Sequence, residues 1–104
     1  MKIIESSNEF NNLIAKDGLC VVDLFATWCG PCRMLAPILE QVAVKTEGKC
    51  TIAKVDVDEL EDVAIAYGVN TIPTLLYFKA GKLLEKSVGL RSEEQIIATI
   101  EKYI

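Results

Sequence analysis

The sequence contains no histidine. Imidazole is a frequent general base near neutral pH and the commonest metal ligand in proteins. Its absence excludes Cys–His nucleophilic catalysis, metal sites with histidine ligands and pH switching by histidine. Any general base in this chain must therefore be a carboxylate, a lysine or a thiolate.

A basic patch and a long apolar run are also missing. The 11 Lys and Arg residues are scattered and outnumbered by 15 Asp and Glu, for a net charge of −4, whereas phosphate binding needs clustered positive charge. No window approaches the ~20 apolar residues of a membrane span, and residues 1–5 lack the apolar stretch of a signal peptide. We therefore expect no nucleic-acid or membrane partner and a cytoplasmic location. Thiols stay reduced there, so a close cysteine pair is more often catalytic or metal-binding than structural.

The apolar periodicity predicts an α/β fold in a single domain, residues 1–104. The elements are expected in the order β-α-β-α-β-α-β-β-α. Because strands that alternate with helices form a parallel sheet covered on both faces, and the late hairpin adds an antiparallel pair, we expect a central mixed five-stranded sheet flanked by four helices.

Strands are expected at residues 3–4, 19–26, 51–57, 74–78 and 83–88. The helix signals are capping boxes at Ser6 with Glu9 and at Ser92 with Gln95, Asp58 as N-cap and Gly68 as stop of a short helix, and Pro37 inside the helix after Trp28.

The segment Trp28-Cys29-Gly30-Pro31-Cys32 carries the candidate chemistry. It lies where a buried strand ends and a helix begins, and the free N–H groups and dipole of a helix N-terminus favour a thiolate at Cys29. Cys32 lies one turn deeper on the same side. Pro31 suits the first helical turn, and Gly30 leaves the first sulfur open to a partner. We therefore expect Cys29 to be the exposed nucleophile and Cys32 to be the buried resolving thiol.

This arrangement predicts thiol–disulfide exchange. The thiolate of Cys29 attacks a substrate disulfide and forms a mixed disulfide. Cys32 then attacks Cys29, which releases the reduced substrate and leaves a Cys29–Cys32 bridge. An external reductant must reopen that bridge.

A zinc site is the alternative interpretation of the pair. A zinc ribbon needs a second C-x-x-C about 15–20 residues away, whereas Cys20 and Cys50 are single and no histidine can substitute. The strand–CxxC–helix context favours redox chemistry, with no metal.

For Cys20 and Cys50 themselves, we favour the role of a small buried hydrophobic residue in a strand, with a regulatory thiol as the alternative.

Further segments accompany the cysteine pair in a fixed order. They are Asp23 in the preceding strand, Pro37 in the helix, Ala53-Lys54-Val55-Asp56, Tyr67-Gly68-Val69, Ile72-Pro73-Thr74, Phe78-Lys79-Ala80-Gly81 and Val88-Gly89. Together with WCGPC, which is more specific than a bare C-x-x-C, they resemble the thioredoxin family along essentially the whole chain.

The resemblance implies the thioredoxin fold and protein-disulfide reductase activity through Cys29 and Cys32. It implies disulfide-containing client proteins as substrates and thioredoxin reductase as electron donor, with NADPH acting only upstream of the reductase and ferredoxin as the alternative electron source. The redox disulfide would be the working group, with no bound cofactor, and we expect a monomer. It further implies that the Ile72–Pro73 peptide bond is cis. The implied apolar docking surface consists of Trp28, Gly30, Pro31, Ile72, Pro73, Val88 and Gly89.

Asp23 and Lys54 are the candidate proton-transfer groups. An Asp in an apolar strand is costly unless it is neutral or paired, and burial raises a carboxyl pKa toward the range where general bases work best. Asp23 is thus the expected base for Cys32, and Lys54 in the adjacent strand would partly offset the pKa shift. The alternatives are an Asp that faces solvent and a Lys whose ammonium reaches water. The resemblance favours a function for both residues.

Two other functions compete with reduction. Oxidases and isomerases stabilise their reduced form, and a histidine between the cysteines would do so, whereas Gly30-Pro31 does not. A non-catalytic module would dock a partner protein through the apolar patch around Trp28.

Overall fold

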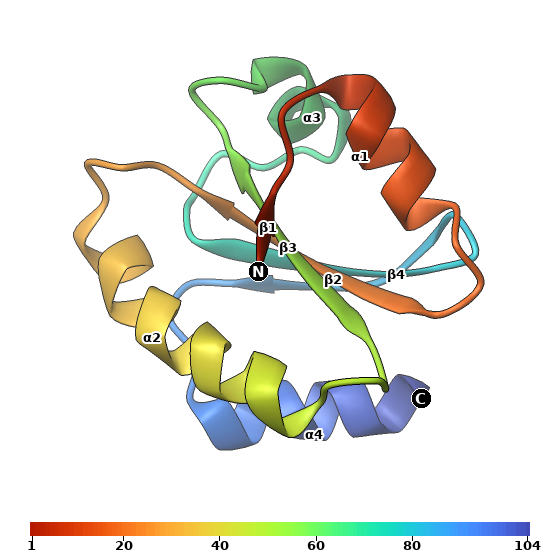
Figure 1. Ribbon diagram of the computed structural model, residues 1–104. Helices are drawn as coiled ribbons and strands as arrows, with labels where there is room; N and C mark the ends of the chain where they lie inside the picture. The colour runs from red at the N-terminus through yellow and green to blue at the C-terminus, as the bar shows by residue number, and fades with distance from the viewer.

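The computed structural model describes all 104 residues, in five strands and four helices (Figure 1). Their order along the chain is the predicted one. The elements are β1 (Lys2–Ile3), α1 (Ser7–Ile14), β2 (Leu19–Phe25), α2 (Gly30–Lys45), β3 (Thr51–Asp56), α3 (Glu61–Ala66), β4 (Thr74–Lys79), β5 (Lys82–Val88) and α4 (Glu93–Tyr103).

The five strands form one mixed sheet in the order β1-β3-β2-β4-β5. β3 pairs in parallel with β1 and β2, whereas β4 pairs antiparallel with β2 and β5. β2 lies at the centre, and residues Leu19 to Leu24 are all buried, as expected of a strand covered on both faces. The predicted five-stranded mixed sheet with four helices is confirmed.

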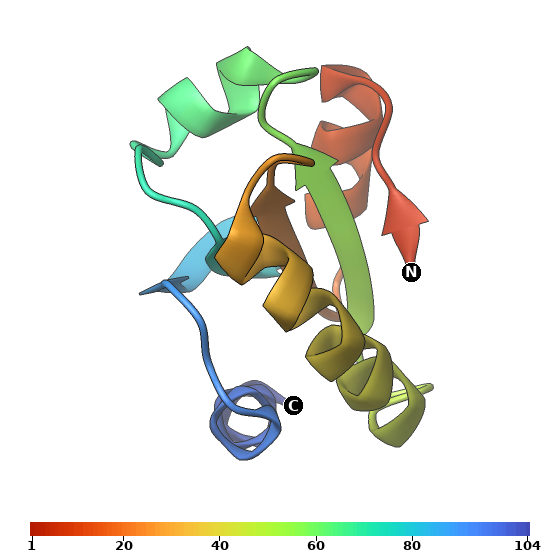
Figure 2. The same cartoon turned by 90° about the vertical axis from the view of Figure 1, so that its left-hand side faces the viewer.

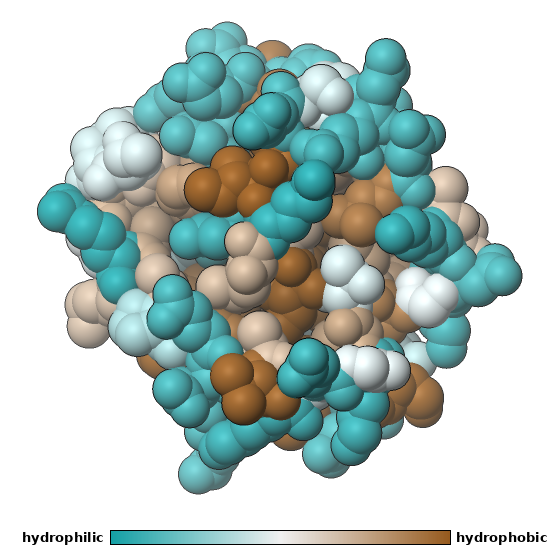
Figure 3. All heavy atoms as spheres, viewed as in Figure 1, coloured by the Kyte–Doolittle hydropathy of each residue, from teal (hydrophilic) through white to brown (hydrophobic).

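Helices cover both faces of the sheet. α1 and α3 lie on one face and α2 and α4 on the other (Figures 1 and 2). Side chains alternate along β2, so Cys20 and Val22 enter the core under α1 and α3, whereas Leu19 and Val21 enter the core under α2 and α4. On the outside, hydrophilic side chains dominate the face seen in Figure 1, and apolar ones show in separate patches (Figure 3).

The two predicted capping boxes form to different extents. At α4, the Ser92 hydroxyl accepts from the Gln95 N–H and the Gln95 side chain accepts from the Ser92 N–H. At α1, the Ser6 hydroxyl accepts from the Glu9 N–H, but the Glu9 carboxylate accepts from the N–H of Glu5 at 2.7 Å. The capping box predicts the Ser6 N–H as donor to the Glu9 carboxylate, so this half of the prediction is wrong by one residue.

The prediction that Asp58 caps the short helix is also wrong. α3 begins at Glu61 after Leu60, which supplies no side-chain cap. The Asp58 carboxylate instead accepts a hydrogen bond from the indole nitrogen of Trp28 at 2.8 Å. Asp58 thus belongs to the surroundings of the cysteine pair, which a local capping pattern does not reveal.

Candidate active site

Cys29 and Cys32 form a disulfide at the junction of β2 and α2, with their Cα atoms 5.2 Å apart. Cys29 is the N-cap of α2, and its Sγ accepts a hydrogen bond from the backbone N–H of Cys32 at 3.2 Å. Pro31 lies in the first turn, where a missing N–H leaves no helical bond unmade. The same N–H would stabilise negative charge on Cys29 Sγ once the disulfide opens, because a hydrogen bond to a charged acceptor is stronger than one to a neutral acceptor.

Both sulfurs are shielded in this disulfide form. Cys29 is 5% exposed and Cys32 is 3% exposed, so the large difference in exposure expected from the sequence is not present here. Gly30 lies on the open side, because a Cβ built there would meet no heavy atom within 4 Å. The surface next to Cys29 therefore carries no side chain at Gly30 and has room there.

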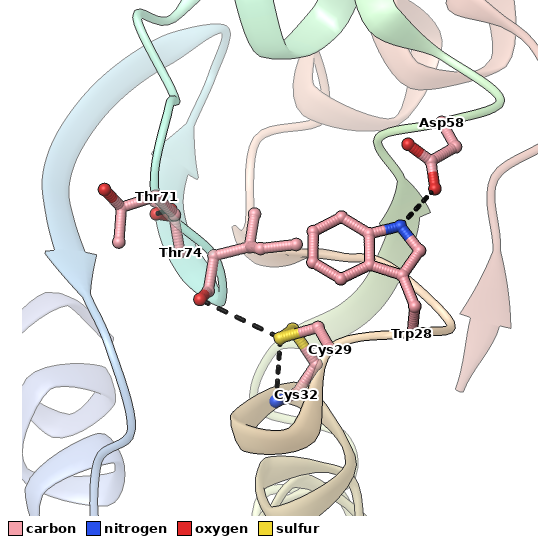
Figure 4. Close-up of a disulfide and its surroundings, with 7 residues drawn as sticks. Trp28, Cys29, Cys32, Asp58, Thr71 and Thr74 are labelled. Carbon is pink, nitrogen blue, oxygen red and sulfur yellow. Dashed lines mark hydrogen bonds between the residues drawn. A yellow bond between two sulfur atoms is a disulfide. The ribbon is translucent and has the colours of Figure 1, made fainter.

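The segment before β4 lies beside the cysteine pair (Figure 4). Its Ile72–Pro73 peptide bond is cis, and the Ile72 carbonyl oxygen lies 3.9 Å from Cys29 Sγ. The Thr74 hydroxyl donates to the Thr71 carbonyl at 2.6 Å, and the Gly89 N–H donates to the Pro73 carbonyl at 2.8 Å. These two bonds hold the Ile72 backbone beside the sulfur. Sequence reasoning did not single out Thr74 for this role.

Trp28 lies on the surface next to the cysteines, 67% exposed, and its indole N–H points at Asp58 (Figure 4). Sequence reasoning missed Asp58 as a site residue. A signal was available, because β2 and β3 are parallel and their carboxyl ends meet at one edge of the sheet. Asp58 follows β3 as Cys29 follows β2, so the two had to lie close together.

The remaining members of the expected docking surface gather around this point. Val88 is 42% exposed at the end of β5, where it pairs with Thr74. Gly89 has a φ of 91°, a left-handed conformation that favours glycine. Pro73 itself is buried. It therefore contributes to the expected docking surface by directing the backbone, because its ring is not exposed.

Asp23 is fully buried in β2, and neither of its carboxylate oxygens has a hydrogen-bond partner. Burial raises the pKa of Asp23 from 3.8 to about 6, and the positive charge of Lys54 opposes that rise in part. The alternative of an Asp facing solvent is excluded. A carboxyl with this pKa changes charge just below neutrality, where proton transfer is most useful.

Asp23 faces the side of the sheet that α2 covers. It follows Val21 by two residues, and Val21 packs in the core with α2. Lys54 pairs with Asp23 in the parallel register of β2 and β3, and its ammonium lies 4.4 Å from the centre of the Phe25 ring. The strand register therefore places the buried Asp23 and the half-buried Lys54 side by side on adjacent strands of the sheet.

Cys20 and Cys50 are free cysteines. Cys20 packs in the core under α1 and α3, whereas Cys50 packs against the core under α2 and α4, so the sheet separates them. Burial raises the pKa of the Cys20 thiol to about 11, with a smaller contribution from Cys50. Cys50 lies just before β3 and is half-buried, with its Sγ 3.5 Å from the Thr46 hydroxyl. The predicted role of a buried residue in a strand therefore holds for Cys20 and is wrong for Cys50.

Neither free cysteine joins the pair in a metal site. No group of three or more His, Cys, Asp or Glu side chains is arranged to hold a metal ion. The zinc interpretation of Cys29 and Cys32 therefore has no set of ligands.

Comparison with known proteins decides the family. The sequence model of the Thioredoxin family matches residues 1–102. A thioredoxin of Staphylococcus aureus (strain MW2) is 40% identical over 104 residues, which covers all of both chains. Among solved structures, the thioredoxin of Fasciola hepatica (TM-score 0.92, 37% identity) and that of Plasmodium falciparum (TM-score 0.90, 36% identity) also match over 100% of both chains.

The chain belongs to the thioredoxin family. The Cys29–Cys32 disulfide stands in the CxxC position of that family, so the protein is a protein dithiol–disulfide oxidoreductase with protein-disulfide reductase activity. Its redox group is this disulfide, since thioredoxins work without a bound cofactor. The family also implies disulfide-containing substrates and a thioredoxin reductase. None of the four helices is long and apolar enough to cross a membrane.

Proposed function

We propose that the protein reduces disulfides of client proteins in the cytoplasm, with Cys29 as nucleophile and Cys32 as resolving thiol. The observation that carries this order of attack is the hydrogen bond from the Cys32 N–H to Cys29 Sγ at the start of α2. The Cys32 N–H is a hydrogen-bond donor that the helix holds in place, and the negative charge that it stabilises is on Cys29. Cys32 lies inside the helix, one turn deeper.

The first step uses Cys29 and the client alone. The Cys29 thiolate attacks one sulfur of the client disulfide, a Cys29–client S–S bond forms, and the other client sulfur leaves as a thiolate that takes a proton from water. The docking surface of Trp28, Gly30, Pro31, Ile72, Pro73, Val88 and Gly89 would hold the client, with extended client backbone pairing beside Ile72.

The second step needs a base. Asp23 accepts the proton of the Cys32 thiol, Cys32 attacks Cys29 Sγ, and the client leaves with both sulfurs reduced. Lys54 tunes Asp23, since its positive charge favours the carboxylate and limits the rise in the pKa of Asp23. Two electrons have then moved from the protein to the client, and the Cys29–Cys32 disulfide is restored.

We further propose that residues 1–104 act as one domain and as a monomer, without nucleic-acid or membrane partners. A thioredoxin reductase would reopen the disulfide with electrons from NADPH. The net charge of −4, with its scattered cations, supports the absence of a nucleic-acid partner.

Reduction of insulin disulfides tests the proposal in two arms. With dithiothreitol as reductant, the protein should accelerate precipitation of the insulin B chain, because the dithiol is regenerated chemically. With a thioredoxin reductase and NADPH instead, insulin should drive NADPH oxidation. Cys29→Ser should abolish both. Failure of the first arm would refute the client reaction, and failure of the second alone would refute the electron donor.

A further inference from the structure

The ammonium of Lys54 is a half-buried charge without an ionic partner. Lys54 takes part in none of the three ion pairs of the chain. It does not bond to Asp23 either, because neither carboxylate oxygen of Asp23 has a hydrogen-bond partner. The group that the ammonium meets is the Phe25 ring, whose centre lies 4.4 Å from Nζ. This ring is thus the contact that can fix the position of the charge.

The pleat and register of the two central strands bring the three side chains to one face of the sheet. Phe25 follows Asp23 by two residues in β2, so both side chains leave the strand on the same side. Lys54 of β3 is paired with Asp23 in the parallel register. The Phe25 ring also packs against the buried cluster that contains Cys29 and Cys32. Phe25 therefore contacts the ammonium and the redox pair at the same time.

An aromatic ring suits this position because it attracts a cation without removing all of its water. The negative face of the ring holds an ammonium within about 6 Å of the ring centre. An ion pair with the fully buried Asp23 would instead require the ammonium to leave water completely, which is costly. An aliphatic side chain would fill the same space but offer no attraction, so the long lysine side chain would turn its charge toward solvent.

Lys54 is the charged neighbour whose position matters to Asp23. Its positive charge opposes the rise in the pKa of Asp23 that burial causes. Asp56 follows Lys54 by two residues on the same face of β3, but its carboxylate accepts a backbone hydrogen bond from the following loop. Leu75, which pairs with Asp23 from β4, is uncharged, and Cys32 on α2 does not titrate while it is oxidised. A displacement of the Lys54 ammonium would therefore change the electrostatic field at Asp23 directly.

We propose that Phe25 is a positioning residue for the second step of the reaction, because its ring holds the Lys54 ammonium beside Asp23 and so controls proton transfer from Cys32. The inference rests on the proposed role of Asp23 as base and adds the residue that fixes its electrostatic surroundings. It requires an aromatic side chain at position 25, and an aliphatic one of similar size does not suffice.

The pKa of Asp23 in two variants tests the positioning. The measurement is NMR of the Asp23 carboxyl carbon in the oxidised protein, where neither Cys29 nor Cys32 titrates. Phe25→Leu should raise the pKa of Asp23 by roughly one unit, because the Lys54 ammonium moves away into water. Phe25→Trp should leave this pKa at or below the parent value, because tryptophan is the ring that binds cations best.

Lys54→Gln provides the control for a change in burial. Leucine is smaller than phenylalanine, so water comes closer to Asp23 in Phe25→Leu, and this alone lowers the carboxyl pKa. In the Lys54→Gln background, Phe25→Leu should therefore produce no rise. The difference between the two backgrounds measures the coupling that runs through the ammonium.

The pH profile of mixed-disulfide resolution should move with the pKa of Asp23. In Phe25→Leu, release of client by Cys32 should be roughly fivefold slower at about pH 6 and close to the parent rate at about pH 8. A ring that only packed the site would change the rate by the same factor at every pH. Stopped-flow measurement of client release separates these two results.

An unchanged or lowered pKa of Asp23 in Phe25→Leu would overturn the inference, and so would an equal rise in the Lys54→Gln background. Phe25→Trp must differ from Phe25→Leu, because equal shifts would show that aromatic character is irrelevant. If the pKa of Asp23 rose as expected while the pH profile of resolution stayed in place, Phe25 would position Lys54, but the proposed role of Asp23 as base would fail.

Discussion

Asp23 occupies a fully buried position of the central strand without a hydrogen-bond partner for its carboxylate. An ionised carboxylate in such a place is costly, and the group responds by holding its proton to higher pH. Burial raises the pKa of the Asp23 carboxyl from 3.8 to about 6, which reflects that cost. We propose that the chemical use of this costly group is transfer of the Cys32 proton.

The stability of an Asp23→Asn variant should depend on pH in a defined way. The pKa of Asp23 is higher in the folded chain, about 6 against 3.8, so between these values the folded state binds the extra proton and the stability of the parent falls as pH rises. Asparagine does not titrate. The free energy of unfolding of Asp23→Asn should therefore exceed that of the parent by an amount that depends on pH. The difference should be near zero at pH 4 and level off at roughly 2–3 kcal/mol above pH 7.

Urea unfolding at several pH values measures this gain. Glu101→Gln is a suitable control, because that exposed acid lies outside the core. A constant difference between Asp23→Asn and the parent across the whole range would contradict the proton linkage.

The same variant should slow resolution of mixed disulfides near neutral pH. Without a base, Cys32 must lose its proton to water, which is slower while the thiol is buried. The expected loss is about 10²-fold or more, from the usual contribution of a general base. Stopped-flow release of client across roughly pH 6–9 is the measurement. Release at the parent rate throughout would make Asp23 a purely structural residue.

Cys20 and Cys50 should remain unpaired thiols after oxidation. They pack on opposite faces of the sheet, and a disulfide requires Cα atoms within about 7 Å and converging Cβ bonds. Non-reducing mass spectrometry should show one bridge per chain. The Cys20 thiol, with a pKa of about 11, should also react with iodoacetamide more slowly than Cys50. Detection of a second bridge would refute the assignment.

At the scale of the elements, local signals explain much of what the sequence predicted. β2 is almost entirely apolar and proved to be the central strand, and Ser92 with Gln95 forms both halves of its capping box. The failures have a common cause. The Glu9 carboxylate binds both Lys2 and the Glu5 N–H, and Asp58 binds Trp28, so partners outside the helix displaced the local bonds.

Ser92→Ala should destabilise the protein by about 1 kcal/mol, because the Gln95 N–H loses its acceptor at the start of α4. Thermal unfolding measures the effect. The matched variant is Ser87→Ala, which removes a hydroxyl from β5 rather than from a helix cap and should change stability less. Equal losses would show that the cap contributes nothing specific.

For the whole molecule, the site is assembled from segments far apart in the sequence. The Ile72 carbonyl contacts a sulfur 43 positions earlier, and Asp58 binds the indole 30 positions earlier. Periodicity and capping patterns carry no information on such contacts. The position of the cysteine pair and the burial of Asp23 could be predicted from local chemistry and the apolar strand, whereas the cis Ile72–Pro73 bond was expected only through the family resemblance. The sequence did not predict the apolar pocket that Trp28 and Ile65 line, because that pocket forms only where α3 lies beside Trp28.

The order of attack is the central claim, and trapping of mixed disulfides with a client tests it most directly. Reduced Cys32→Ser and Cys29→Ser proteins are mixed with a disulfide-containing client such as insulin, quenched with acid and separated on non-reducing gels. Cys32→Ser should accumulate a stable mixed disulfide through Cys29, because no thiol remains to resolve it, whereas Cys29→Ser should accumulate almost none. The reverse pattern, with the client bonded to Cys32, would contradict the account.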